Sequence, residues 1–406
     1  MADPTAHYEL PKPPAYGKQS IAEVLESGAA SIGLPGFSNK LNLPPAQRVC
    51  VVLADGLGRS MLKAKGAHTP FIRAALAAGQ GSVPTWLDAA FPTTTAASLA
   101  SLGTAKEPGK HGMVGYDVLD PQLGRVVNML GNWDADVDPT TWQPEATVFE
   151  RASQHTEVVT VSLPQFADSA MTKAALRGSK FIGGGNSHAR TQAAAEAMAS
   201  SPNMLMYFYT NELDKAGHRD GWRSEQWEVQ LEELDHTIKR LATTLPSGTT
   251  ILLTGDHGMV DVPESQRIDF SAEPELIRGV RYTAGEPRMV HLYLEPELDP
   301  AAAEALLGTW RTRFGEKIWA FTRQQAITAG LFGLVEPRVI PRIGDIMIAA
   351  REELALYDTR RVRPSAMDVV GQHGSLTKAE REVPLVMFTA TGNPKTSPKR
   401  SHTSKR

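Results

Sequence analysis

Five short apolar runs divide the chain, and turn-forming or polar residues border each of them. They span residues 47–54, 157–163, 204–209, 249–254 and 384–389. The first run shows no alternation of apolar and polar positions, which is typical of a strand buried on both faces of a sheet. Helical periodicity occurs at 20–27, 69–79, 95–103, 190–200 and 224–243. Because strands alternate with helices, the pattern predicts an α/β fold with a mostly parallel sheet.

The stretch from about 260 to 365 has a different pattern. Acidic and proline-rich loops are followed by apolar segments at 290–294, 317–321 and 345–350. We interpret residues 261–365 as an α+β cap inserted into a metal-binding catalytic core, which comprises residues 1–260 and 366–390. The last residues, 391–406, carry five basic side chains and no acid, so we expect a disordered basic tail there.

Composition limits the classes of protein that fit the chain. It has 406 residues, 41% of them hydrophobic and 21% charged, which is typical of a globular protein. Its net charge of -3 gives no electrostatic reason to expect a nucleic-acid polymer as a partner. The single cysteine, Cys50, excludes a disulfide framework and a zinc site built from cysteines.

Signals for membranes and secretion are missing from the sequence pattern. No run of 18 apolar residues occurs, and the first residues lack the basic and apolar regions of a secretory signal. We therefore expect a cytoplasmic protein without a membrane partner. No heptad repeat or long apolar edge stands out, so we expect a monomer.

Carboxylate and imidazole side chains flank four of the predicted strands. They are Asp55 after 47–54, Asp214 and His218 after 204–209, Asp256 and His257 after 249–254, and His373 before 384–389. Sites in open α/β sheets form outside the carboxyl ends of the strands, so we expect these side chains to meet at one edge. Oxygen and imidazole ligands suit zinc, manganese or iron. Each residue alone is usually a turn or surface position, but the whole set predicts a two-metal hydrolytic centre.

Threonines that precede a helix of small residues are the second source of candidate chemistry. The segment reads FPTTTAASLASLGT over residues 91–104, with threonines at 93–95. Capping of the helix start is the simpler explanation. Alternatively, one hydroxyl lies beside a metal ion, which lowers the pKa of the hydroxyl and makes it a nucleophile. The backbone N–H groups at the helix start would then favour phosphate oxygens.

The order of these motifs resembles that of a known family. Asp-Gly at 55, Phe-Pro-Thr-Thr-Thr at 91, His-Gly at 111, Asp-x-x-x-His at 214, Asp-His-Gly at 256 and His-Gly at 373 follow the order of the alkaline phosphatase superfamily. The pattern is most similar to its type I phosphodiesterase/nucleotide pyrophosphatase branch. The resemblance covers residues 47–112, 204–259 and 371–387, and it implies an alkaline-phosphatase-like three-layer α/β/α core.

The resemblance also implies roles for individual residues. It makes Thr95 the catalytic nucleophile, which carries a covalent phosphothreonine intermediate. It implies two divalent metal ions, manganese or zinc, as cofactors. One ion would be held by Asp55, Thr95, Asp256 and His257, and the other by Asp214, His218 and His373.

The segment after Thr95 departs from the pattern of the secreted members of this branch. Those enzymes usually continue with Phe-Pro-Asn-His, whereas positions 96–99 read Ala-Ala-Ser-Leu here. The asparagine of that run normally helps to hold a phosphate oxygen, and Ser98 is expected to replace it only in part. Lys215, inside the Asp-x-x-x-His motif, is a second candidate for contact with the phosphate.

The continuation AASLASLGT is instead similar to soluble actinobacterial members of the superfamily, which include phosphodiesterases that act on cyclic di-AMP. This resemblance implies hydrolysis of cyclic di-AMP through linear pApA to AMP, with a small nucleotide as the partner. The main alternative is a nucleotide pyrophosphatase that cuts dinucleotides or nucleoside triphosphates; a phosphomonoesterase or phosphonate hydrolase is another. A metal or nucleotide sensor, or an interaction protein that works through the basic tail, would need no nucleophile.

Overall fold

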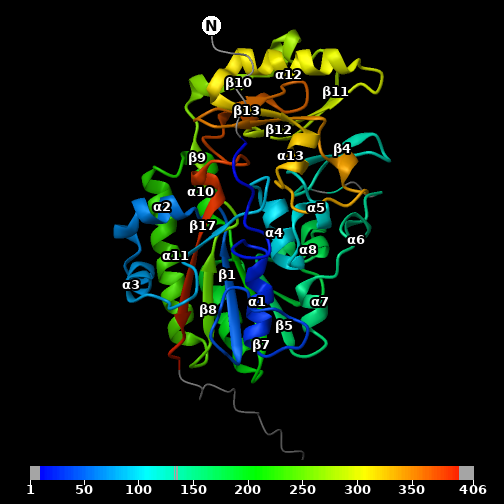
Figure 1. Ribbon diagram of the computed structural model, residues 1–406. Coiled ribbons are helices and arrows are strands. Elements are labelled where there is room, and N and C mark those ends of the chain that lie inside the picture. The colour runs from blue at the N-terminus through cyan, green and yellow to red at the C-terminus, as the bar shows by residue number, and fades with distance from the viewer. Residues whose placement is uncertain (1–9, 132, 134–135, 393–406) are drawn as a thin grey trace, which may run out of the picture.

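A seven-stranded sheet forms the centre of the molecule. The computed structural model describes residues 10–131, 133 and 136–392 (Figure 1). The strands lie in the order β2-β17-β8-β1-β7-β5-β6. Their bounds are β1 Arg48–Ala54, β2 Trp86–Asp88, β5 Glu157–Ser162, β6 Lys180–Gly183, β7 Met204–Thr210, β8 Thr250–Thr254 and β17 Glu382–Thr389. All pairs from β8 across to β6 are parallel, which confirms the predicted mostly parallel sheet.

Helices cover both faces of this sheet because its central strands are apolar on both sides. Along β1, Val49, Val51 and Leu53 pack into one hydrophobic cluster, whereas Cys50 and Val52 pack into another. The first cluster includes α1 Glu23–Ser31, α4 Thr95–Thr104, α7 Val148–Ala152 and α8 Ala170–Ala175. The second includes α2 Arg59–Ala64, α3 Pro70–Ala78, α9 Ser187–Ala199 and α11 Glu225–Thr244. The result is the expected three-layer α/β/α core.

The five apolar runs all form strands of this sheet, but the last one differs in direction. β17 runs antiparallel to β8 and to β2. An apolar run shows that a strand is buried but does not encode its direction. The short edge strands β2 and β6 are not marked by the hydrophobic pattern, since β6 is only partly buried and β2 has three residues.

A second, antiparallel sheet lies beyond one end of the core (Figure 1). Its order is β11-β12-β14-β13, with bounds β11 Val280–Glu286, β12 Met289–Leu294, β13 Ile318–Thr322 and β14 Ile346–Ala350. One face packs on α12 (Pro300–Phe314) in a separate hydrophobic cluster, and the other face joins the core cluster through residues such as Met347. The predicted apolar segments of the cap are therefore strands. The boundaries at 261 and 365 stay a prediction.

The remaining elements connect these parts. They are β3 Asp117–Asp120, β4 Arg125–Asn128, β9 Val260–Asp261, β10 Arg267–Asp269, β15 Ala355–Tyr357, β16 Gly371–Gln372, α5 Pro108–His111, α6 Pro139–Trp142, α10 Glu212–Asp220, α13 Arg323–Thr328 and α14 Lys378–Arg381. In the described part of the chain, no helix combines the length and apolar character needed to cross a membrane. The predicted basic tail lies outside the described residues, apart from positions 391 and 392.

Candidate active site

Strand ends deliver the predicted metal ligands to one edge of the central sheet. Asp55 directly follows β1, and Asp256 and His257 follow the neighbouring strand β8. On the other side of β1, β7 leads into α10, which carries Asp214 and His218. Because β1, β7 and β8 are parallel, their carboxyl ends lie at the same edge.

Asp55, Thr95, Asp256 and His257 form the first cluster of side chains, and all four are buried. Nε2 of His257 lies 3.2 Å from the hydroxyl oxygen of Thr95. The same nitrogen lies 3.5 Å from Oδ1 of Asp55 and 3.5 Å from Oδ2 of Asp256. Three oxygen atoms and this ring nitrogen therefore lie close together, as the ligands of a single cation do.

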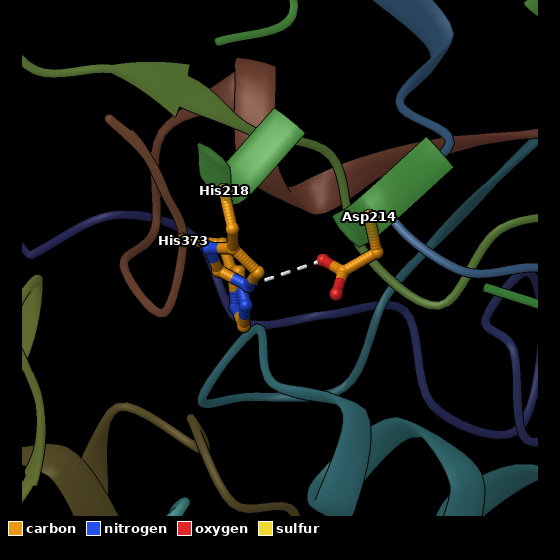
Figure 2. Close-up of side chains that lie close together, drawn as sticks. All are labelled: Asp214, His218 and His373. Atoms are coloured by element: carbon orange, nitrogen blue, oxygen red, sulfur yellow. Dashed lines mark ion pairs between the residues drawn. The ribbon is translucent and has the colours of Figure 1, made fainter. Parts of the chain in front are cut away.

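Asp214, His218 and His373 form the second cluster (Figure 2). Asp214 and His218 lie one turn apart on α10, and Oδ1 of Asp214 is 3.2 Å from Nε2 of His218. The ring of His373 lies 5.2 Å from that of His218 and stacks on His257 at 3.6 Å, centroid to centroid. Asp214 also approaches the first cluster, since one donor atom each from Asp55, Asp214 and His257 lies within 4.8 Å of the other two.

The three histidines share one hydrogen-bonding pattern. Each Nδ1 contacts a backbone carbonyl oxygen: that of Gly371 for His218 at 2.7 Å, Gly258 for His257 at 3.0 Å and Thr93 for His373 at 2.9 Å. A carbonyl oxygen can only accept a hydrogen bond, so each Nδ1 carries a proton. In the neutral ring, Nε2 then keeps a lone pair for a metal ion.

The buried carboxylates lack partners that a cation would supply. Oδ1 of Asp55, Oδ1 of Asp214 and Oδ2 of Asp256 have no hydrogen-bond partner among the described residues. Burial, followed by the charges of Asp256 and Asp214, raises the pKa of Asp55 well above its ordinary value. Burial alone would lower the pKa of His218, but Asp214 raises it to about 9. A divalent cation would replace the proton on Nε2 of His218, and two such ions would satisfy the unpartnered carboxylate oxygens. The donor set therefore fits two divalent cations.

Thr95 begins helix α4, and its neighbours do not cap that helix. Thr94, at the N-cap position, makes no capping hydrogen bond through its side chain. The hydroxyl of Thr93 donates instead to the carbonyl oxygen of Ser375 at 2.7 Å. Capping therefore does not explain these threonines. The N–H groups of the first helical turn have no partner within the helix and are suited to an anion.

A cavity of about 640 Å³ adjoins both clusters and Thr95. Its wall on the core side carries mostly uncharged side chains: Leu99, Thr160, Phe166, Met171, Leu176, Phe181, Tyr207 and Tyr209. The cap contributes further apolar side chains, such as Phe270 and Val290, together with the charged groups Glu286 and Arg361. The cavity therefore has largely apolar walls with a few charged groups near the candidate nucleophile.

The structure places the two candidate phosphate contacts differently. Ser98 is fully buried, and its hydroxyl donates to the backbone carbonyl of Asp256 at 2.7 Å. It does not line the cavity, so the geometry speaks against the predicted phosphate contact and gives Ser98 a role in holding the loop of Asp256. Lys215 is exposed on α10 and lines the cavity; among the described residues, its amine forms no ion pair.

Three residues of this site are not marked by any sequence motif. The hydroxyl of Tyr209, on β7, donates a hydrogen bond to Oδ2 of Asp55. Asn211, the residue before α10, is buried with an unpartnered side-chain oxygen and lines the cavity. Glu286 comes from the cap and is also buried in the cavity wall. A tyrosine near the carboxyl end of an apolar strand is a weak signal for Tyr209; Glu286 has none.

Similarity to solved structures supports the alkaline-phosphatase-like fold. Murine ectonucleotide pyrophosphatase/phosphodiesterase 5, an inactive threonine-to-alanine variant in complex with AMP, matches with a TM-score of 0.63 and 16% identity, over 86% of this chain and 90% of that chain. Phosphonoacetate hydrolase from Sinorhizobium meliloti 1021, in complex with phosphonoformate, matches with a TM-score of 0.64 and 17% identity, over 89% and 94%. At these identities the likeness concerns the fold alone. No curated protein matches the sequence significantly.

The sequence itself identifies the family. The model of the family described as type I phosphodiesterase/nucleotide pyrophosphatase matches residues 49–376. This range includes every candidate ligand and the candidate nucleophile, and it spans most of the chain. The chain therefore belongs to the type I phosphodiesterase/nucleotide pyrophosphatase family.

Proposed function

We propose that this protein is a metal-dependent phosphodiesterase that uses Thr95 as its nucleophile. Its family consists of metal-dependent hydrolases of phosphodiester and pyrophosphate bonds. One observation carries the residue assignment: the Thr95 hydroxyl lies at the start of α4, 3.2 Å from Nε2 of His257, and faces the cavity. A hydroxyl held among unpartnered carboxylate oxygens is suited to lose its proton when a cation is bound there.

The donor set supports two divalent ions, manganese or zinc. Asp55, Thr95, Asp256 and His257 would hold one of them, and Asp214, His218 and His373 the other. When bound, such ions lower the pKa of the hydroxyl and of water and neutralise charge on the phosphoryl oxygens. The backbone carbonyls of Gly371, Gly258 and Thr93 fix the imidazole tautomers in advance, so the rings need no rearrangement to act as ligands.

The reaction then takes two displacements at phosphorus. In the first, the ionised Oγ of Thr95 attacks, a P–O bond to the alcohol arm breaks, and that arm leaves after it takes up a proton. In the second, water attacks the phosphothreonine, the P–Oγ bond breaks, and a phosphate monoester and the free hydroxyl of Thr95 result. The free N–H groups at the start of α4 are suited to orient the phosphoryl oxygens in both steps.

For the substrate, we propose cyclic di-AMP, which would be opened to linear pApA and then cut to AMP. The sequence after Thr95 supports this choice through its similarity to actinobacterial enzymes. The cavity of about 640 Å³ supports it as well, because it is well above the lower bound of roughly 300 Å³ for ligand pockets and Thr95 lines it. The complex of murine ectonucleotide pyrophosphatase/phosphodiesterase 5 with AMP adds support for a nucleotide.

A substrate panel tests this proposal. The metal-loaded protein is assayed in parallel on cyclic di-AMP, pApA, ATP, NAD, phosphonoacetate and p-nitrophenyl phosphate, with products separated by chromatography. We expect AMP from the first two substrates at rates well above the others. A preference for ATP or NAD would make the protein a nucleotide pyrophosphatase. Turnover of only the monoester or the phosphonate would overturn phosphodiester hydrolysis altogether.

A further inference from the structure

Glu286 brings an unpartnered carboxylate from the cap into the candidate active site. It is the last residue of β11, where the chain turns into β12. Its side chain lines the cavity and is only 7% exposed. Oε2 lies 3.7 Å from Nδ1 of His373, and Oε1 has no hydrogen-bond partner among the described residues.

The neighbours of Glu286 do not satisfy this carboxylate. Nδ1 of His373 already donates to the carbonyl oxygen of Thr93, at 2.9 Å. The hydroxyl of Thr94 is close by, yet it forms no hydrogen bond of good geometry with any residue that the structure describes. The other charged groups that act on Glu286 are the acids Asp117 and Glu380, which carry their own cationic partners. An orphaned buried acceptor costs free energy unless something supplies a donor.

The backbone is built to hold this side chain in place. Gly285 has φ +85°, and a Cβ there would lie 2.1 Å from the carbonyl oxygen of Met289 across the hairpin. Gly374, next to His373, has φ +126°, and a Cβ there would lie 2.5 Å from Cγ of Glu286. Both positions therefore require glycine. Gly374 thus leaves the space that the Glu286 side chain occupies, and Gly285 allows the close approach of β11 to β12 beside it.

We propose that Glu286 accepts a hydrogen bond from an N–H or O–H group on the nucleoside arm that leaves the phosphorus attacked by Thr95, and that it thereby favours substrates whose leaving arm offers such a donor. This inference rests on the proposed function. Glu286 lies beside His373, which belongs to the second cluster, on the cap side of the cavity. A ribose hydroxyl or the adenine amine would supply the donor, whereas an ionised phosphate offers only acceptors.

Two variants separate the hydrogen bond from the rest of the side chain. Glu286→Leu removes the acceptor, and Glu286→Gln keeps an acceptor in a side chain of similar size. We expect Glu286→Leu to raise KM for pApA by roughly tenfold, since one hydrogen bond to a buried group is lost. Glu286→Gln should raise it less. The KM for bis(p-nitrophenyl) phosphate, which offers no donor, should rise less than the KM for pApA. The matched control is Asp358→Asn, a cap carboxylate that already accepts from Thr283 and pairs with Arg360.

Substrate analogues identify the donor. A 2′-deoxy analogue of pApA removes the ribose hydroxyl, and an inosine analogue removes the amine. The analogue that lacks the donor group should bind wild type and Glu286→Leu alike. Equal losses of kcat on all substrates, together with loss of metal, would overturn the proposal and make Glu286 a support for His373.

Calorimetry separates failure of this inference from failure of the proposed function. Binding of pApA is measured in the Thr95→Ala background, with and without Glu286→Leu, so that no turnover is needed. A wild type that cuts no nucleotide diester but binds pApA through Glu286 would sink the proposed function and keep the inference. Binding that is the same with and without Glu286 would overturn the inference alone.

Discussion

The hydroxyl of Tyr209 donates a hydrogen bond to Oδ2 of Asp55 and leaves Oδ1 of that carboxylate free, 3.5 Å from Nε2 of His257. Tyr209 lies in β7, and its register partner is Leu53, two residues before Asp55 in β1. The pairing of two parallel strands thus fixes which carboxylate oxygen faces the first cluster. Tyr209 acts here as a positioning residue behind a candidate metal ligand.

Replacement of Tyr209 by phenylalanine should loosen the first metal site without opening a large cavity. We expect metal affinity or kcat to fall by about 10- to 100-fold, as for other residues that orient a metal ligand. The matched control is Tyr207→Phe, two residues earlier in the same strand. Within the described part of the chain, the buried hydroxyl of Tyr207 has no hydrogen-bond partner. Metal titration followed by steady-state kinetics checks both variants. Equal behaviour of the two variants would show that the contact with Asp55 has no role.

Asp214 belongs to the second cluster and also lies close to the first. Its loss should therefore reduce metal retention more than the loss of another acid on the same helix. We expect Asp214→Asn to lose metal on dialysis and to unfold at a lower temperature than metal-loaded wild type. Asp220→Asn, also on α10, is the control. Elemental analysis and thermal unfolding, each with and without a chelator, provide the readouts. Full metal occupancy and full activity of Asp214→Asn would count against the proposed ligand set.

A fully buried ion pair ties the cap to the core. Nε and Nη2 of Arg288, in the turn between β11 and β12, bind Oε1 and Oε2 of Glu380 at 2.7 and 2.9 Å, and both side chains are completely buried. Arg288→Met leaves a buried carboxylate unpaired, so we expect it to cost about 3–5 kcal/mol of unfolding free energy. The double variant with Glu380→Gln should recover much of that loss. The exposed pair Arg313–Glu273 gives the control, where Arg313→Met should cost less than about 1 kcal/mol. Urea unfolding measures each value, and additive losses would contradict this coupling.

Buried His111 should make the protein less stable as the pH falls. Burial first, then Arg338 and Arg342, lowers the pKa of His111 to about 3. Its Nδ1 accepts a hydrogen bond from the backbone N–H of Met113. Protonation of Nδ1 would break this hydrogen bond and create a buried charge. The pKa of this histidine is about 6.5 in the unfolded chain, so between pH 6.5 and pH 3 the unfolded chain binds one proton more than the folded chain. The unfolding free energy should therefore be fully present above pH 6.5 and fall by about 1.4 kcal/mol per pH unit below it.

The variant His111→Gln isolates this effect. Its unfolding free energy should be lower than that of wild type at pH 7, but the difference should shrink as the pH falls from 6.5 to 4.5. Replacement of the exposed His188 by glutamine controls for loss of an imidazole as such. Unfolding curves over this pH range provide the measurement. A constant difference between wild type and His111→Gln would contradict the assignment.

The sequence reveals the parts of this protein whose chemistry follows from local pattern. Apolar runs mark the buried strands, and an acid within two residues after such a run lies at the carboxyl edge, as Asp55 and Asp256 do. The four-residue spacing of Asp214 and His218 places both on one face of α10. Family resemblance then supplies Thr95, which local pattern leaves open among three threonines.

The remaining features depend on contacts between segments that are far apart in the sequence. The direction of β17 follows from its connection across the sheet rather than from its apolar residues. Ser98 has a hydroxyl like many phosphate ligands, yet its neighbour is the carbonyl of Asp256, 158 positions away. Glu286 enters the cavity only because the cap packs on the core. No periodicity or motif encodes such contacts.

The most direct test of the central claim is the rate of pApA hydrolysis by Thr95→Ala, with metal content measured on the same samples. We expect kcat to fall by about a thousandfold or more, because the nucleophile is gone, while the metal content stays nearly unchanged. Thr94→Val, which removes the neighbouring unpartnered hydroxyl, should keep most of the activity. A Thr95→Ala enzyme that retains metal and turns over within tenfold of wild type would contradict the claim that Thr95 attacks the phosphodiester.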